Sequence, residues 1–238
     1  MTTKTIEFYE PEHGLEIEPY IETENKQGIH HLGRYQWARR VLRDLEVKTL
    51  LDVACGVGYG SYLLAKALPS TLVTGADYDE RAVDRAKESY AAENLHFIQG
   101  DMVTWQRMDP SLPLGHFDAI ASFDTIEHLM HREVALLRMA ENLTDDGVLL
   151  LSTPCHRLPI LNPGWEHHKI EYSFADLYGM LCRFFHDVRF PENRSLPHLD
   201  FWENVINKDR QRYLNRMNPV VCRKPIRLET SYEKVSAQ

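Results

Sequence analysis

Two short segments concentrate side chains that can bind a metal ion or move a proton. The segment FDTIEHL carries Asp124, Glu127 and His128 at positions i, i+3 and i+4, a spacing that predicts one face of a helix start. The segment HHKIEY adds His167 and His168. Carboxylates and imidazoles together can hold a divalent metal such as Mg²⁺ or Mn²⁺. Without a metal, His128 or His168 is the candidate general base, because a neutral imidazole titrates near working pH.

A glycine-rich turn, LLDVACGVGYG, spans residues 50–60. Glycines let the backbone turn tightly and let a ligand lie against it, while the following helix offers free N–H groups; a tight turn without a ligand is the alternative. Asp77 stands 21 positions beyond Gly56, at the end of a second apolar run. An acid at that place can accept hydrogen bonds from both ribose hydroxyls. The combination indicates an adenosine-containing ligand, either NAD or S-adenosylmethionine (SAM).

A third apolar run ends in QGDM, which brings Asp101 and Met102 to the same edge of the expected sheet. The Asp101 carboxylate can accept from an adenine amino group, the Met102 backbone N–H can donate to a ring nitrogen, and Tyr78 can supply an adenine platform. A helix cap is the structural alternative for Asp101.

The elements that position these residues alternate between strand and helix patterns. Buried strands are predicted over 49–54, 71–77, 95–100, 117–123 and 148–154, and helices over 31–46, 58–68, 80–93 and 127–142, with Asp79 capping the third helix. Such alternation implies an α/β fold with a Rossmann-like, mostly parallel sheet and helices on both faces. Ligands of these sheets bind beyond the carboxyl ends of the strands.

The remaining segments suggest the domain organisation. We expect residues 1–30 to form an N-terminal arm or lid and residues 31–238 to form one domain. Within that domain, residues 153–172 are expected as an aperiodic acceptor-side loop and residues 192–216 as a cap with a helix over 200–216. A helix over 173–185, a strand near 186–191 and a last strand over 219–228 complete the prediction.

Composition limits the class of protein. The 238 residues carry a formal net charge of −8, which disfavours nucleic acid as the main partner. The four cysteines form no CxxC pair, the N-terminus has no apolar core, and no apolar run approaches the ~18 residues of a membrane span. We therefore expect a cytoplasmic protein that acts on a small molecule.

The segments DVACGVGYG, GADYD, GDM, FDAIASFDTIEHL and DGVLLLSTP, in this order, resemble the motifs of class I SAM-dependent methyltransferases over roughly residues 30–228. The resemblance implies a seven-stranded sheet whose last strand is antiparallel. It also implies a set of cofactor-binding positions: Gly56 and Gly58 at the methionine part of SAM with Asp52 and Ala54 of the same segment, Asp77 at the ribose, Asp101 and Met102 at the adenine, and Phe123 beside the sulfonium. The segment HHLGRYQWA resembles the first helix of bacterial methyltransferases from polysaccharide and secondary-metabolite pathways, where Arg34 would hold the SAM carboxylate.

The acidic and histidine segments resemble the ExxEH…HKxEW pattern of small-RNA 3′-terminal 2′-O-methyltransferases and, in part, that of ubiquinone-type O-methyltransferases. This likeness implies a metal held by Asp124, Glu127, His128 and His168. Asp124 replaces the first glutamate and Tyr172 the tryptophan, so the first carboxylate is one methylene shorter. The alternative is structural, with Glu127 favoured by a helix dipole and His128 covering the cofactor pocket.

The leading hypothesis is a SAM-dependent methyltransferase that methylates a hydroxyl of a small molecule or sugar, with His128, His168 and Glu127 as the catalytic residues. An RNA 2′-O-methyltransferase is the runner-up, and it rests on the EH…HKxE pattern. An NAD-dependent oxidoreductase fits the glycine turn and Asp77 but leaves GDM and the last strand unexplained. A non-catalytic SAM-binding partner subunit is the alternative from another class.

Overall fold

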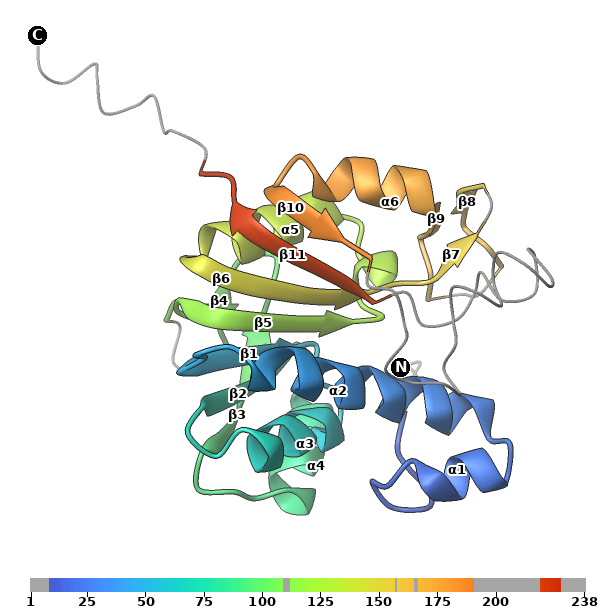
Figure 1. The fold of residues 1–238 in the computed structure, drawn as a ribbon, viewed down its shortest axis with the longest axis vertical. Coiled ribbons are helices and arrows are strands. Elements are labelled where there is room, and N and C mark those ends of the chain that lie inside the picture. Colours follow the sequence, from blue (N-terminus) through green and yellow to red (C-terminus); the bar gives the residue numbers. More distant parts are fainter. Residues whose placement is uncertain (1–8, 109–111, 157, 165–166, 191–218, 228–238) are drawn as a thin grey trace, which may run out of the picture.

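An eight-stranded sheet forms the centre of the protein in the computed structural model, which describes residues 9–108, 112–156, 158–164, 167–190 and 219–227 (Figure 1). The strands lie in the order β10 (Phe185–Arg189), β11 (Val220–Pro225), β6 (Leu143–Ser152), β5 (Phe117–Phe123), β1 (Thr49–Val53), β2 (Leu72–Asp77), β3 (Leu95–Asp101) and β4 (Gln106–Arg107). All pairs from β6 to β3 are parallel, whereas β11 is antiparallel to both β6 and β10. The expected α/β class and the antiparallel last strand are therefore confirmed.

The strand count exceeds the expected seven by one short strand. The two residues of β4 turn back and pair with the end of β3 in antiparallel fashion, Gly100 opposite Arg107 and Asp101 opposite Gln106. This short return closes the sheet edge beside Asp101, so it adds an element next to the predicted adenine position.

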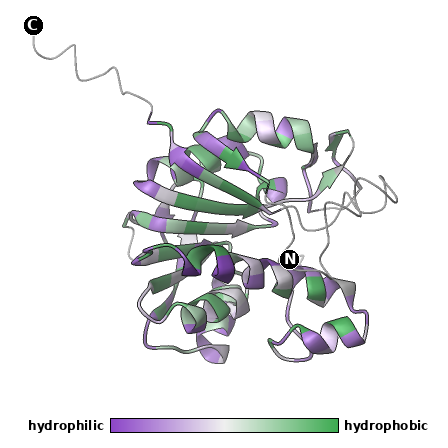
Figure 2. Cartoon of the chain, viewed as in Figure 1, coloured by the Kyte–Doolittle hydropathy of each residue, from purple (hydrophilic) through white to green (hydrophobic). Residues whose placement is uncertain are grey.

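Helices cover both faces of the sheet: α1 (Glu18–Glu22), α2 (Lys26–Arg43), α3 (Tyr59–Ala67), α4 (Glu80–Ser89), α5 (Arg132–Glu141) and α6 (Phe174–Leu181). Consecutive residues of β1 show the two-sided burial, because Leu50 packs into the cluster beneath α2 and α3 while Leu51 packs into the cluster beneath α5 and α6. Neither side chain is exposed, as the near-continuous apolar run of a buried parallel strand requires. In Figure 2, β5 and β6 are hydrophobic along most of their length.

Several helix boundaries differ from the sequence prediction. Helix α2 begins at Lys26, five residues early, because the Asn25 side chain accepts a hydrogen bond from the Gly28 N–H and caps it. The helix expected over 127–142 is wrong in its first turn: a 3₁₀ turn covers Ile126–His128 and α5 starts only at Arg132. Helix α4 does begin after the Asp79 cap, whose carboxylate accepts from Arg81 N–H, but it ends at Ser89.

The segment expected as an aperiodic loop over 153–172 contains a second, three-stranded sheet. Its order is β7 (Cys155–His156), β9 (Ile170–Ser173), β8 (Ile160–Leu161), with β7 parallel and β8 antiparallel to β9. The predicted helix over 200–216 and the cap over 192–216 lie outside the described residues. Among the helices of the described part of the chain, none is long and apolar enough to cross a membrane.

Candidate active site

A pocket of about 1590 Å³ opens where the parallel strands end. Its walls come from the turn after β1, the ends of β2, β3 and β5, helix α2 and the second sheet. Most of the residues singled out from the sequence line it: Arg34, Ala54, Gly56, Asp77, Tyr78, Asp101, Met102, Phe123, Asp124, Glu127, His128 and His168. The strand-end placement inferred from the α/β pattern thus brings together residues that are far apart in the chain.

The turn after β1 and the end of β2 are joined by the Asp77 carboxylate. The Gly56 N–H donates to Asp77 Oδ2 at 2.8 Å, and the Asp79 N–H donates to Asp77 Oδ1 at 2.9 Å. Gly56 has φ +55° and Ala54 has φ +59°, so the turn uses left-handed backbone at two nearby positions. Burial raises the pKa of Asp77, while its backbone hydrogen bonds act in the opposite direction. The carboxylate is therefore fixed in orientation at the pocket wall.

Gly58 and Asp52 do not line this pocket. Gly58 caps α3 with φ +85°, and a Cβ there would lie 2.7 Å from the Ala86 Cβ and the Phe97 ring, so backbone conformation and packing against α4 and β3 explain the glycine. Asp52 is fully buried beneath the turn, where its carboxylate accepts from Ser61 Oγ at 2.6 Å and from the Tyr35 hydroxyl at 3.3 Å. Burial raises the pKa of Asp52 to about 7.

At the end of β3, Asp101 and Met102 reach the pocket side by side. Asp101 Oδ1 accepts a hydrogen bond from the Val103 N–H at 2.7 Å and so stabilises a turn. No helix follows Asp101 directly, so the alternative in which Asp101 caps a helix is wrong. Tyr78 lines the same region and is 65% exposed, so a flat ligand has room to stack on its ring.

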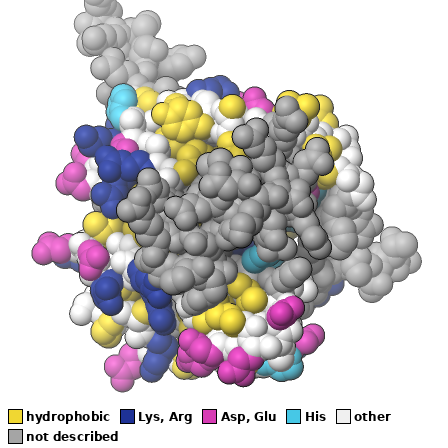
Figure 3. Space-filling model, turned by 45° about the vertical axis from the view of Figure 1, so that its right-hand side comes forward, with side chains coloured by type: hydrophobic (Ala, Val, Ile, Leu, Met, Phe, Trp, Pro, Cys, Tyr) yellow, Lys and Arg dark blue, Asp and Glu magenta, His cyan; other side chains and the backbone are white. Residues whose placement is uncertain are grey.

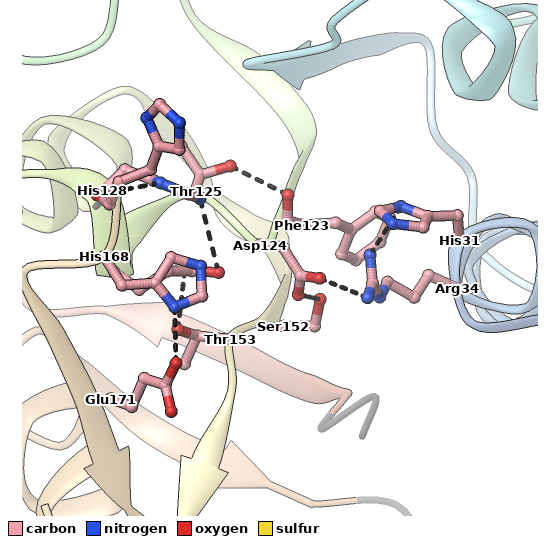
Figure 4. A network of polar contacts seen from close by, with 12 residues as sticks. His31, Arg34, Phe123, Asp124, Thr125, His128, Ser152, Thr153, His168 and Glu171 are labelled. Atoms are coloured by element: carbon pink, nitrogen blue, oxygen red, sulfur yellow. Dashed lines mark hydrogen bonds and ion pairs between the residues drawn. The ribbon is translucent and has the colours of Figure 1, made fainter. Parts of the chain in front are cut away.

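Arg34 of α2 and Asp124 at the end of β5 form an ion pair across the pocket (Figure 4). Ser152 Oγ donates to the other carboxylate oxygen of Asp124 at 3.0 Å, and Asp124 adopts φ +46°. Phe123 packs edge-on against Tyr35, with ring centroids 5.1 Å apart. Asp124 thus points toward Arg34. The expectation that it shares a helix face with Glu127 is wrong, because Asp124 lies before the short 3₁₀ turn of Ile126–His128 and has non-helical backbone.

Three side chains could bind one metal ion: Glu127, His128 and His168. Each offers one ligand atom, and these three atoms lie within 4.8 Å of one another. Glu127 is fully buried; Thr153 Oγ1 donates to its Oε2 at 2.8 Å, and its Oε1 has no hydrogen-bond partner in the described structure. His128 Nε2 lies 3.9 Å from that Oε1, and the two imidazole rings meet edge-to-face at 4.7 Å. Of the four residues predicted as metal ligands, only these three converge; Asp124 does not join them.

The two imidazoles of this cluster are oriented through their Nδ1 atoms. His168 Nδ1 lies 2.6 Å from Glu171 Oε1, and His128 Nδ1 lies 3.3 Å from the carbonyl oxygen of His167. A carbonyl and a carboxylate only accept, so in the neutral form of each ring Nδ1 carries the hydrogen and Nε2 carries the lone pair. Glu171 was not singled out from the sequence, although it stands three residues after His168 in the quoted HHKIEY segment.

A sequence model for a family described as methyltransferase domain matches residues 46–214. The chain belongs to this methyltransferase family. The match extends over most of the chain and includes the turn after β1, the strand ends and the histidine segment. The protein is a class I SAM-dependent methyltransferase, so its cofactor is SAM and not NAD.

Several known proteins are similar to this chain in sequence or in fold. Demethylmenaquinone methyltransferase of Staphylococcus aureus is 30% identical over 152 residues, which cover 61% of this chain and 60% of that protein. The chain thus spans about 60% of the length of the curated relatives it matches. An O-methyltransferase of a Brevibacillus brevis polyketide multienzyme, solved with S-adenosylhomocysteine (SAH), has a TM-score of 0.58 at 13% identity, covering 87% of this chain and 77% of that chain. The N-methyltransferase NodS of Bradyrhizobium japonicum, also with SAH, has a TM-score of 0.50 at 18% identity, covering 65% and 74%.

The methyltransferase pocket includes residues that the sequence analysis did not count among its site residues. These lining residues are Tyr9, Gln27, His31 and Tyr59. His31 Nδ1 lies 3.3 Å from Arg34 Nη1, and burial followed by the Arg34 charge lowers the pKa of His31 to about 3. Nothing in the sequence indicated that His31 would lie at the pocket wall, apart from its position about one helical turn before Arg34.

Proposed function

We propose that this methyltransferase transfers the SAM methyl group to a hydroxyl oxygen of a small molecule or sugar. The observation that carries the proposal is the part-buried His168–Glu171 pair facing the pocket beside Glu127 and His128. Methyl transfer to a hydroxyl needs a base for the departing proton, whereas the sulfonium brings its own driving force. An imidazole held by a carboxylate meets that need.

In the proposed mechanism His168 accepts the proton on Nε2. The acceptor oxygen forms its bond to the methyl carbon as the carbon–sulfur bond breaks, and the hydroxyl proton moves to the imidazole. Glu171 keeps the Nδ1 hydrogen in place at 2.6 Å and stabilises the imidazolium that forms. His128, with the weaker 3.3 Å contact to a carbonyl oxygen, is the second candidate base.

A divalent metal is a second way to activate the same hydroxyl, and the residues present fit one. Glu127 Oε1 is a buried carboxylate oxygen without a hydrogen-bond partner among the described residues, and it lies 3.9 Å from Nε2 of His128. A ring nitrogen of His168 belongs to the same cluster. Burial and the neighbouring Asp124 charge hold the pKa of Glu127 well above its usual range, so a cation would favour its ionised form. Glu127, His128 and His168 would hold the metal, which would lower the pKa of the acceptor hydroxyl. Two imidazoles favour Mn²⁺ over Mg²⁺.

The cofactor placement follows the pocket walls. We propose that Gly56 and Ala54 lie against the aminocarboxypropyl chain, Asp77 accepts from the ribose hydroxyls, and Asp101, Met102 and Tyr78 surround the adenine. Phe123 would flank the sulfonium and Arg34 would hold the carboxylate. Gly58 and Asp52, which lie behind the wall, would support the turn without touching the cofactor.

The charges of the pocket favour an uncharged acceptor over RNA. Arg34 is the single Lys or Arg among the described residues that line it, and we assign it to the SAM carboxylate. The acidic lining residues are Asp77, Asp101, Asp124, Glu127 and Glu171. In Figure 3 the Lys and Arg side chains visible on this face lie mostly along its left side, with a further group at the top. A polyanion would meet repulsion at such walls.

The proposal is tested with methyl-labelled SAM and the variants His168→Asn and Glu171→Gln. We expect His168→Asn to lower kcat at least 100-fold and Glu171→Gln to lower it about 10- to 100-fold, the range of a lost charge-assisted hydrogen bond, while SAH affinity stays unchanged. His186→Asn, an exposed histidine on β10, is the matched control. Unchanged turnover in both site variants would contradict the base assignment, and full activity after EDTA treatment would exclude the metal.

A further inference from the structure

The N-terminal segment of residues 9–14, which we call the strap, lies against the cofactor part of the pocket. Tyr9 lines the pocket and stacks on His31 with ring centroids 4.2 Å apart and an interplanar angle of 8°. Its ring also meets Tyr59 edge-on at 5.9 Å. Tyr59 is the first residue of α3, directly after the glycine turn. The strap therefore packs beside the turn to which the cofactor binds.

Both ends of the strap are anchored to helices. The Glu10 carboxylate accepts from Arg85 of α4 through both of its oxygens, with Nη2 distances of 2.8 and 2.7 Å. At the other end, the His13 N–H donates to the Tyr20 hydroxyl at 2.8 Å, and this hydroxyl donates to the Gly14 carbonyl at 3.0 Å. Tyr20 of α1 is fully buried. The strap thus bridges α4, which follows the ribose-side strand β2, and α1, which precedes α2.

The walls of the pocket leave one place for the amino-acid end of the cofactor. Asp77 and Asp101 lie at the strand ends proposed for adenosine, and the methyl group must face the cluster of Glu127, His128 and His168. The single Lys or Arg among the described lining residues is Arg34 of α2, which lies beside His31 and therefore next to Tyr9 of the strap. Other lining residues, such as Ile160, Pro163 and Gly164 of the second-sheet segment, carry no charge. Arg34 supplies the positive charge that a carboxylate requires.

We propose that the strap closes over the aminocarboxypropyl group of bound SAM, with Tyr9 and His31 as its wall. His31 can contribute a donor, because its Nδ1 faces the donating Arg34 Nη1 at 3.3 Å and its hydrogen therefore resides on Nε2. Tyr9 is a positioning residue in this account, since its stacked ring fixes the His31 plane. The proposal rests on the SAM dependence of the family and not on the identity of the acceptor.

Cofactor exchange then requires the strap to move. The latch that must open is the Glu10–Arg85 pair, whose side chains are 44% and 51% exposed. An ion pair of this exposure contributes little, about 0.2–1 kcal/mol, which corresponds to a change of about 1.4- to 5-fold in the rate of opening. Such a latch can close the site and still permit turnover.

The test compares two ligands that differ only in the group the strap would cover. SAH carries the aminocarboxypropyl chain, and 5′-methylthioadenosine lacks it. We expect Tyr9→Ala to weaken SAH binding about 10-fold in calorimetry and to leave 5′-methylthioadenosine within 2-fold. Equal weakening of both ligands, or no weakening of either in a folded variant, would overturn the proposal.

The latch is tested by SAH release in stopped flow. Glu10→Gln and Arg85→Gln should each speed release by about 1.4- to 5-fold, and the double variant should add nothing further, because both remove one interaction. Glu12→Gln, which removes the same charge from an exposed position of the strap, is the control. Additive effects of Glu10→Gln and Arg85→Gln, or an equal effect of Glu12→Gln, would count against the latch. If the unmodified protein did not bind SAH at all, that result would instead contradict the family assignment.

Discussion

Asp52 makes the stability of this protein depend on pH in a direction that the structure specifies. Its carboxyl is fully buried, and burial raises its pKa from 3.8 to about 7. Between these two values the folded state keeps a proton that the unfolded state releases, so the free energy of unfolding falls as pH rises. The free energy of unfolding decreases by about 1.4 kcal/mol for each pH unit and by about 4 kcal/mol in total, and the decrease ends above pH 7. The stabilising contribution is therefore fully present only below pH 3.8.

The variant Asp52→Asn removes the titration and keeps the shape of the side chain. Urea unfolding at half-unit steps from pH 5.5 to 8 should show the unmodified protein losing about 2 kcal/mol relative to Asp52→Asn by pH 7, with no further divergence above pH 7.5. Asp84→Asn, an exposed carboxylate on α4, should run parallel to the unmodified protein. Parallel curves for Asp52→Asn as well would refute the reasoning, because they would mean that Asp52 is ionised beneath the glycine turn at all these pH values.

Three further predictions concern the site and its support. Gly58→Ala should lower the unfolding free energy by about 2–4 kcal/mol in urea titrations without changing SAH affinity, whereas Gly14→Ala, at φ +79° with open space around it, should cost only about 1 kcal/mol. Asp124→Asn should destabilise the unliganded protein by roughly 3 kcal/mol, because the buried Arg34 loses its counter-charge. Saturating SAH should restore part of this stability, whereas equal losses with and without SAH would contradict the proposal that Arg34 binds the SAM carboxylate. Mn²⁺ should raise the melting temperature of the unmodified protein and not of Glu127→Gln, and a shift that persists in the variant would place the metal elsewhere.

The strands were predictable because burial on both sheet faces leaves a periodic record in the sequence. The run TLLDVA predicted β1 to within one residue, and Leu50 and Leu51 indeed pack on opposite faces. The acidic residues at strand ends were predictable for a related reason, since parallel strands deliver their carboxyl ends to one edge. Asp77 and Asp101 reach the pocket for this reason alone.

The structural predictions that proved wrong concern segments whose conformation depends on contacts with distant parts of the chain. The spacing of Asp124, Glu127 and His128 fits a helix, but Asp124 is held at φ +46° by Arg34 and Ser152, which come from other elements. Local periodicity carries no trace of such an ion pair. The same limit applies to residues 153–172, where the strands are two to four residues long and gain their stability by pairing with one another.

Gly58 illustrates a different limit. Glycine at a strand–helix turn is required both by ligands that approach the backbone and by packing that leaves no room for a Cβ. The sequence pattern is identical in the two cases. Only the 2.7 Å approach of the Ala86 Cβ and the Phe97 ring distinguishes Gly58, which serves packing, from Gly56, which lines the pocket.

We propose that methyl transfer from SAM to an acceptor hydroxyl takes place at the His168–Glu171 pair. The most direct measurement incubates the purified protein and its His168→Asn variant with methyl-labelled SAM and three separated cell fractions: small metabolites, polysaccharides with nucleotide sugars, and RNA. We expect label in one of the first two fractions, in an O-methyl group identified by NMR, and a rate at least 100-fold lower for the variant. Label in RNA, or label on nitrogen or carbon, or equal rates for the two proteins would contradict it.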